Sequence, residues 1–254
     1  MSFGQARHGR VAEIVMDFPP VNALPIQAWF DLAEIVTTLG RDPEVSVVIL
    51  AAEGRGFCAG PDMKELASGG GEALIGINRA CYAAFAAVYE CEVPVIAAVQ
   101  GFCVGGGIGL VGNADVIIAA DDAVFGLPEV DRGALGAATH LSRLVPQKRL
   151  RSMFYTGENA TAAELKSYGS VLEVVTRAEL RGAANRFAER IAEKHTTVIR
   201  RAKESINLIE AVDPRKSYRI EQGFTFELNH TDVPDEARRA FVEKRNPDFD
   251  SKRG

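Results

Sequence analysis

The sequence predicts an α/β fold in which strands and helices alternate, followed by a helical C-terminal region. Three features support this prediction. Short apolar runs have the length and β-branched composition of buried strands, apolar residues at helical spacing lie between them, and the pattern turns helical from Leu141 onward. The chain has 254 residues and 47% hydrophobic content, which suffices for one large core.

The first predicted unit is a strand followed by a helix. Residues Gly9 to Asp17 alternate enough to form a strand, which Pro19-Pro20 ends. Pro25 then suits the first position of a helix, and an apolar stripe at helical spacing continues from Trp29 to Leu39.

Three later runs read as strands buried on both faces, as in a parallel sheet. They are Val45 to Ala51, Pro94 to Val99 and Asp115 to Ala120. An alanine-rich helix is expected over Ala80 to Tyr89, and Ala123 to Gly126 is expected to be a short further strand. The repeated order is strand, strand, helix.

The C-terminal part reads as helices. Thr161 and Glu164 have the spacing of a capping box, and the last helix is expected near Asp235 to Lys244. We therefore divide the chain into a core, residues 1–195, and a helical C-terminal region, residues 196–254.

Charge and hydropathy exclude several classes of partner. The net charge is -5, so no global positive field favours a nucleic-acid backbone. The basic clusters Gln147 to Arg151 and Arg200 to Lys203 are typical of solvated helix faces. No apolar run reaches the roughly 18 residues that span a bilayer, and the N-terminus does not resemble a signal peptide. We expect a soluble cytoplasmic protein that binds neither nucleic acid nor membrane.

The four cysteines are Cys58, Cys81, Cys91 and Cys103, and they show neither zinc-ligand spacing nor a redox pair. Reduced, packed thiols and the absence of a metal site are expected. The run Gly107 to Gly112 satisfies the G-x-G-x-x-G dinucleotide pattern. However, the next strand begins near Asp115, and a crossover needs at least about 10 to 12 residues between strands. These glycines are expected instead to bring backbone N–H groups close to an anionic oxygen.

Two glycine-rich segments carry a family signature. They are Gly56 to Glu65 and Val99 to Gly109, each after a buried strand, and Phe125 to Glu129 follows them. Together they closely resemble the crotonase, or enoyl-CoA hydratase/isomerase, superfamily. The resemblance extends to Pro20–Leu24 near the start and to Ala240–Arg245 near the end.

This resemblance implies a crotonase-type spiral of ββα units and a homotrimer or dimer of trimers. It also implies an acyl-CoA substrate and no cofactor beyond the coenzyme A moiety. Members of the family hold the thioester carbonyl with two backbone N–H groups, and the matching positions in this sequence are Pro61 and Gly106. The residues implied to contact coenzyme A are Ala59, Pro61, Asp62, Met63, Lys64, Phe241 and Lys244. An aromatic face suits adenine, and an ammonium suits phosphate. Phe241 could instead be a packing residue on an apolar helix stripe, and Lys64 could be a solvated helix residue.

Glu129 is the first candidate for general acid or base. Family hydratases use two glutamates; Glu129 matches one, and the other would fall at Gly109. We expect neighbouring apolar residues to desolvate the Glu129 carboxylate and raise its pKa, although a rim ion pair would also explain the residue. Asp131 is a weaker candidate. His140 heads an apolar helix and is more typical of a structural histidine than of a base.

Pro61 departs from the family pattern because proline has no backbone N–H. A working oxyanion site must then rely on Gly106, on a neighbouring donor such as Asp62, or on a water.

Within the superfamily, the sequence is most similar to ring-opening CoA-ester hydrolases of bacterial steroid C and D ring degradation. The stretches that carry this similarity are Pro25 to Leu32, Val88 to Asn113, Phe125 to Pro146 and Glu221 to Asn229. Such enzymes add water to a ring ketone of a bicyclic dione and leave charge on an enolate. Two alternatives stay open: an enoyl-CoA hydratase or isomerase of β-oxidation, and a non-catalytic acyl-CoA-binding protein.

The residue at position 109 separates the first two interpretations. A single carboxylate suits ring opening better than hydration, so the chain is expected to hydrate crotonyl-CoA poorly. Gly109→Glu is expected to raise hydration, provided that the new side chain fits.

Overall fold

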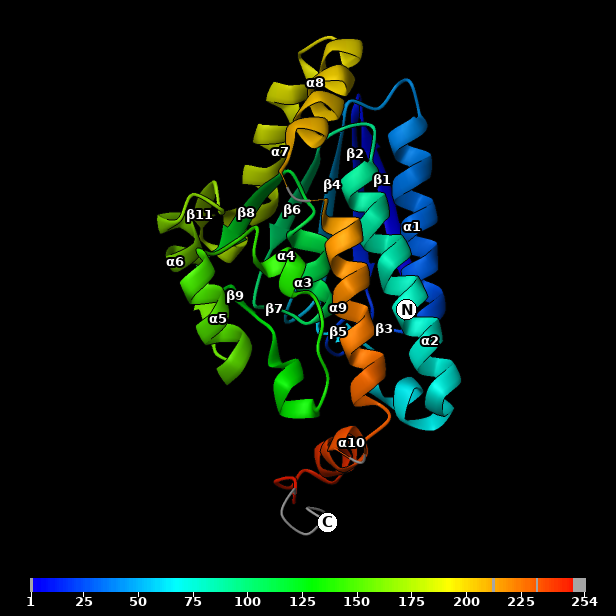
Figure 1. Cartoon of the computed structure of the whole chain (residues 1–254). Coiled ribbons are helices and arrows are strands. Elements are labelled where there is room, and N and C mark those ends of the chain that lie inside the picture. The colour runs from blue at the N-terminus through cyan, green and yellow to red at the C-terminus, as the bar shows by residue number, and fades with distance from the viewer. Residues whose placement is uncertain (1, 212, 232, 249–254) are drawn as a thin grey trace.

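The computed structural model describes residues 2–211, 213–231 and 233–248 (Figure 1). The strands are β1 Ser2–His8, β2 Val11–Asp17, β3 Ala23–Leu24, β4 Val47–Ala52, β5 Gly60–Pro61, β6 Val95–Val99, β7 Phe102–Val104, β8 Val116–Ala120, β9 Val124–Gly126, β10 Asn159–Thr161 and β11 Glu173–Val175. The helices are α1 Ile26–Arg41, α2 Met63–Glu90, α3 Gly106–Val111, α4 Ala138–Leu141, α5 Gln147–Thr156, α6 Ala162–Ser167, α7 Leu180–Ala192, α8 Thr196–Ile209, α9 Pro214–Leu228 and α10 Val233–Glu243, with the 3₁₀ helices η1 Pro128–Arg132 and η2 Arg177–Glu179.

A large, mostly parallel sheet forms the centre of the fold. Its strand order is β1-β2-β4-β6-β8-β11, and β1 alone among these strands pairs in the antiparallel sense. The three runs that were expected to be buried strands are β4, β6 and β8, so this prediction is confirmed. In β4, Val48 and Leu50 pack into one core while Val47 and Ile49 pack into the other, as the two-residue period of a strand requires.

Helices cover both faces of this sheet. Helices α1 and α2 run side by side along one face, and α7 covers the opposite face (Figure 1). The buried residues of α7 are Leu180, Ala183, Ala184 and Ala188, which recur at helical spacing and pack on the second core. The sheet is therefore buried on both sides, which explains why its central strands are almost continuously apolar.

The repeated unit is a long strand, a short strand and a helix. The units are β2-β3-α1, β4-β5-α2 and β6-β7-α3. Each long strand joins the large sheet, whereas the short strands form two small sheets, β3-β5 and β10-β9-β7. This confirms the expected arrangement of ββα units. The short strand β9 pairs with β7 and β10 rather than with β8.

Two elements near the N-terminal half differ from the prediction. Strand β1 was not expected, because its side chains are mostly exposed and carry no apolar pattern; pairing with β2 holds it at the sheet edge. Helix α2 begins at Met63, far ahead of the expected start at Ala80. Asp62 caps it by accepting the Lys64 N–H at 2.9 Å, and Gly70, with φ 56°, interrupts the helical backbone.

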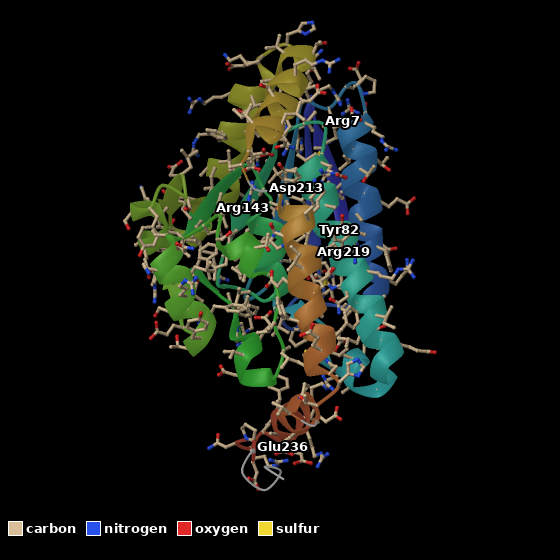
Figure 2. All side chains as sticks on the ribbon, in the orientation of Figure 1. Arg7, Tyr82, Arg143, Asp213, Arg219 and Glu236 are labelled. Carbon is tan, nitrogen blue, oxygen red and sulfur yellow. The ribbon has the colours of Figure 1, made fainter. Side chains whose placement is uncertain are left out.

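The C-terminal helices pack partly on the core. Figure 2 shows Arg219 of α9 beside Tyr82 of α2, with the guanidinium carbon 3.9 Å from the ring centroid. Helix α10, the expected last helix, lies beyond the end of α9 and packs against η1 (Figure 1). Whether the chain divides functionally at residue 195 stays a prediction, and residues 249–254 of that region lie outside the described residues.

The prediction that Arg200 to Lys203 form a solvated face is wrong for two of these residues. Lys203 is 4% exposed and its Nζ lies 2.7 Å from Asp115 Oδ2. Arg200 donates to the backbone oxygen of Gly40 at 2.6 Å. Lys203 and Arg200 of α8 therefore face Asp115 and the Gly40 carbonyl, whereas Arg201 of the same helix stays exposed.

All four cysteines lie within the described residues, are buried and form no disulfide, as expected. Burial raises the pKa of Cys58 to about 12 and that of Cys91 to about 11, so these thiols stay protonated near neutral pH. In the part of the chain that the structure describes, no helix has both the length and the apolar character to cross a membrane.

Candidate active site

The two signature segments lie against each other. The Phe57 N–H donates to the backbone oxygens of Gln100 and Phe102, both at 2.9 Å. The Val104 N–H donates to Cys58 O at 2.9 Å. Segments that are far apart in the sequence therefore form one wall of the candidate site.

Gly60 and Gly106 bring the backbones of the two segments close together. Gly60 has φ +89°, and a β-carbon at this position would lie 2.9 Å from the Gly106 nitrogen. Gly106 is the first residue of α3, where a backbone N–H has no acceptor within the helix. This N–H can therefore serve an external oxygen, as the resemblance implies.

Pro61 stands beside Gly60 in the short strand β5. The N–H of the next residue, Asp62, donates to Leu24 O at 2.9 Å. Because successive residues of a strand point their N–H groups to opposite sides, the Pro61 nitrogen faces away from β3. Pro61 lines the cavity and has no hydrogen to offer it. The suggestion that Asp62 supplies the missing donor is wrong, because its N–H is already committed to β3.

Asn22 holds the first segment in place. Its side chain is buried, its Oδ1 accepts the Phe18 N–H at 2.7 Å, and its Nδ2 donates to Glu53 O at 2.8 Å and to Gly56 O at 2.9 Å. Its φ is 50°, a left-handed conformation that asparagine tolerates. The side chain of Asn22 therefore fixes the loop that leads to Gly60.

Glu129 is the second residue of η1, which follows the buried Leu127. A β-carbon at Gly105 would lie 2.8 Å from Glu129 Oε1, so the carboxylate sits next to the peptide that joins Gly105 to Gly106. Burial raises the pKa of Cys81 and of Tyr218 well above their ordinary values, and the charge of Glu129 adds to both shifts. The candidate base and the candidate oxyanion donor therefore share one site.

A cavity of about 110 Å³ connects these groups with α2, α9 and α10. Five of the residues singled out from the sequence line it: Ala59, Pro61, Met63, Gly106 and Glu129. The other described residues of the lining were not predicted to belong to the site; they are Leu66, Leu74, Ile77, Asn78, Cys81, Phe85, Ala134, Leu135, Gly136, Ala137, Tyr218, Thr225, Asn229 and Arg238.

The other residues implied to contact coenzyme A lie outside this lining. Asp62 and Lys64 begin α2 next to Met63, with Lys64 exposed. Phe241, 46% exposed, and Lys244 lie at the end of α10. Their roles stay predictions.

His140 is a core residue. It is 1% exposed, and burial, with a smaller contribution from the Arg143 charge, lowers its pKa to about 3. It does not line the cavity, so the structure favours the structural interpretation. Asp131 is exposed, also lies outside the lining, and sits against Gly157, where a β-carbon would lie 2.7 Å from Asp131 Oδ2.

The space at Gly109 is occupied. A β-carbon at this buried glycine would lie 2.2, 2.3 and 2.5 Å from Cζ, Cε2 and Cε1 of Phe85. A glutamate at this position would overlap the ring. The condition attached to the Gly109→Glu prediction, that the new side chain fits, is therefore not met unless the Phe85 ring moves.

Helix α9 supplies a polar stripe. Its buried residues Tyr218, Gln222 and Thr225, and Asn229 just after its end, recur at spacings that place them on one helical face, and the Thr225 hydroxyl donates to Leu135 O at 2.7 Å. This spacing is visible in the sequence and could have indicated a polar lining. Among the described residues, no cluster of three or more histidine, cysteine, aspartate or glutamate side chains could hold a metal ion.

Comparisons with known proteins agree with this geometry. The family model described as enoyl-CoA hydratase/isomerase matches residues 6–252. A relative from Rhodococcus jostii, named (7aS)-7a-methyl-1,5-dioxo-2,3,5,6,7,7a-hexahydro-1H-indene-carboxyl-CoA hydrolase, is 61% identical over 93% of this chain and 92% of its own. A relative of the same name from Mycobacterium tuberculosis is 61% identical over 92% of this chain and 95% of its own.

The fold agrees as well. The structure resembles that of an enoyl-CoA hydratase/isomerase from Xanthobacter autotrophicus with a TM-score of 0.87 and 25% identity, over 95% of this chain and 91% of the other. The chain therefore belongs to the enoyl-CoA hydratase/isomerase family and is an enzyme of the crotonase superfamily.

Proposed function

We propose that this enzyme opens a ring of a bicyclic, steroid-derived CoA thioester by hydrolysing a carbon–carbon bond. The observation that carries the proposal is the make-up of the cavity, where Glu129 is the one carboxylate among the described lining residues. The 61% identity to two indene-carboxyl-CoA hydrolases supports the same reaction class.

Glu129 would act as the general base. It would take a proton from a water molecule while the water oxygen bonds to a ring ketone carbon. The ketone becomes a tetrahedral adduct with one new carbon–oxygen bond. A single carboxylate is enough for this step, because a ketone is already electrophilic.

Collapse of the adduct would then break the bond between the former ketone carbon and the adjacent ring carbon. The electron pair of that bond moves into the thioester as an enolate, and the former ketone carbon becomes a carboxylic acid. The Gly106 N–H would stabilise the enolate oxygen. Glu129 would return its proton to the carbon, so that the net change is the addition of one water.

The remaining contacts would serve the coenzyme A part of the substrate. In this proposal Ala59, Pro61 and Met63 line the acyl end of the groove, Asp62 and Lys64 flank it, and Phe241 and Lys244 cover the nucleotide end. No further cofactor, nucleic acid or membrane takes part.

We place the enzyme in the cytoplasm as a homotrimer or dimer of trimers. Exposed apolar side chains on α9, Ile220 and Phe224, support an assembly that buries this helix.

Mass spectrometry after incubation with a bicyclic indane-dione CoA thioester tests the proposal. The expected product is heavier by one water and carries one additional carboxyl group, which methyl esterification counts. A product of that mass without the new carboxyl group would indicate hydration instead.

An ordinary enoyl-CoA hydratase is the competing function, and crotonyl-CoA distinguishes it. The wild-type enzyme should hydrate crotonyl-CoA poorly, because Glu129 would have to activate water and also supply the proton to the α-carbon. A kcat/KM on the order of 10⁴ M⁻¹s⁻¹ or above for crotonyl-CoA would overturn the ring-opening proposal.

A further inference from the structure

Phe85 lies at the boundary between the buried core and the cavity. It lies on α2, is 2% exposed and lines the cavity. Its ring rests on Gly109, because a β-carbon there would come within 2.2 Å of the ring. While this ring stays in place, position 109 cannot carry a side chain into the site.

Three aromatic side chains fix the Phe85 ring. Trp29 meets it edge-on, with centroids 5.7 Å apart and planes at 90°. His140 meets it at 5.0 Å and 75°, and Tyr218 lies tilted at 5.3 Å. Such edge and tilted contacts are favourable aromatic geometries. The ring therefore has a defined orientation.

The side chains behind Phe85, Asn113 and His140, are buried and hydrogen-bonded to each other. Asn113 Nδ2 donates to Phe85 O at 2.8 Å, which turns Asn113 Oδ1 toward His140 Nδ1 at 3.3 Å. His140 Nδ1 then carries the hydrogen that Asn113 Oδ1 accepts. Both side chains are buried, so this arrangement keeps Phe85 from withdrawing from the cavity.

We propose that Phe85 determines the acyl specificity of this enzyme, by giving the cavity an aromatic wall for a rigid fused ring and by excluding a second carboxylate from position 109. This inference rests on the proposed ring-opening function. Phe85 and Tyr218, with ring centroids 5.3 Å apart, together offer aromatic surface in the same cavity as the charged Glu129. A fused ring buries more apolar area on such a wall than a short flexible chain does.

Phe85→Leu tests the wall while keeping an apolar side chain. We expect kcat/KM for the bicyclic CoA ester to fall by about 10- to 200-fold, the range that changes in apolar pocket contacts produce, while kcat/KM for crotonyl-CoA changes no more than a few fold. Phe187→Leu is the matched control, since Phe187 packs against the core on the opposite face of the sheet. Phe187→Leu should leave kcat/KM unchanged for both substrates. An equal loss for both substrates with Phe85→Leu would overturn the inference.

A second variant tests the exclusion of a carboxylate. Gly109→Glu alone should hydrate crotonyl-CoA no better than wild type, whereas Phe85→Ala combined with Gly109→Glu should hydrate it at least about tenfold faster, since acid–base groups contribute about 10² or more. Faster hydration of crotonyl-CoA by Gly109→Glu alone would show that Phe85 does not control this position. The same conclusion would follow if the double variant is folded, as judged by circular dichroism, but hydrates crotonyl-CoA no faster than wild type.

Equilibrium binding separates this inference from the proposed function. Calorimetry with both CoA esters should show Phe85→Leu weakening the bicyclic ester more than crotonyl-CoA. If wild type binds the bicyclic ester without opening it, the proposed function fails while the specificity inference stands. If wild type opens the bicyclic ester but binds it no more tightly than crotonyl-CoA, the specificity inference fails while the proposed function stands.

Discussion

Replacement of Asn22 by alanine tests how the first signature segment is held. The change removes three side-chain hydrogen bonds, to Phe18 N, Glu53 O and Gly56 O. Each such bond contributes about 0.5 to 1.5 kcal/mol net. Alanine at φ 50° adds about 1 kcal/mol of backbone strain. The sum is a loss of about 3 to 5 kcal/mol in the free energy of unfolding.

Urea unfolding at a fixed protein concentration measures this loss, because an oligomer's stability depends on concentration. In a chain of this size the melting temperature should fall by about 10 °C. The matched control is Asn207→Ala on α8, which loses one side-chain bond, to Tyr89 O, and should cost about 1 kcal/mol. If Asn22→Ala costs no more than this control, Asn22 does not anchor the segment.

Three further variants test other parts of the structure. Pro61→Ala should raise ring-opening kcat by up to about 10²- to 10³-fold if it restores an oxyanion donor; a decrease with intact CoA-ester binding would mean that proline shapes the loop. In the folded wild type the pKa of His140 is lowered to about 3, so between pH 6.5 and 3 only the unfolded chain takes up this proton. The free energy of unfolding of wild type should therefore fall by up to about 1.4 kcal/mol per pH unit as the pH drops through this range, and His140→Gln should remove this contribution. Parallel urea-derived pH profiles would contradict this. Lys203→Met should cost about 1.5 to 3 kcal/mol, because it removes the bonds from the buried Lys203 Nζ to the partly exposed Asp115 carboxylate, whereas the exposed Arg201→Met should be nearly neutral in the same urea assay; equal values would refute a stabilising role of this pair.

The central strands could be predicted because their environment is uniform. A parallel strand buried on both faces must be apolar at every position, and β4, β6 and β8 meet that requirement. Strand β1 was missed because its residues are exposed and polar, and pairing with β2 rather than burial selects its conformation. The early start of α2 was missed because Gly69 to Gly71 suggests a loop, whereas the Asp62 cap and a break at Gly70 accommodate these residues.

The residues of the site that belong to short sequence motifs could be predicted. Glu129 and Gly106 follow from motifs, and the structure places them around one cavity. Phe85 and Arg238 could not be assigned, because their place in the lining depends on how α2 and α10 pack. The steric relation between Phe85 and Gly109 is likewise tertiary, so the sequence revealed a missing glutamate but not what fills its space.

Ring opening in water labelled with heavy oxygen, by wild type and by Glu129→Gln, tests the role of this carboxylate most directly. One heavy oxygen should appear in the new carboxyl group with wild type. With Glu129→Gln the rate should fall by about 10² to 10⁴, while calorimetry shows CoA-ester affinity within a few fold, because only proton transfer is lost. Incorporation of heavy oxygen by Glu129→Gln at the wild-type rate would contradict the central role of this carboxylate.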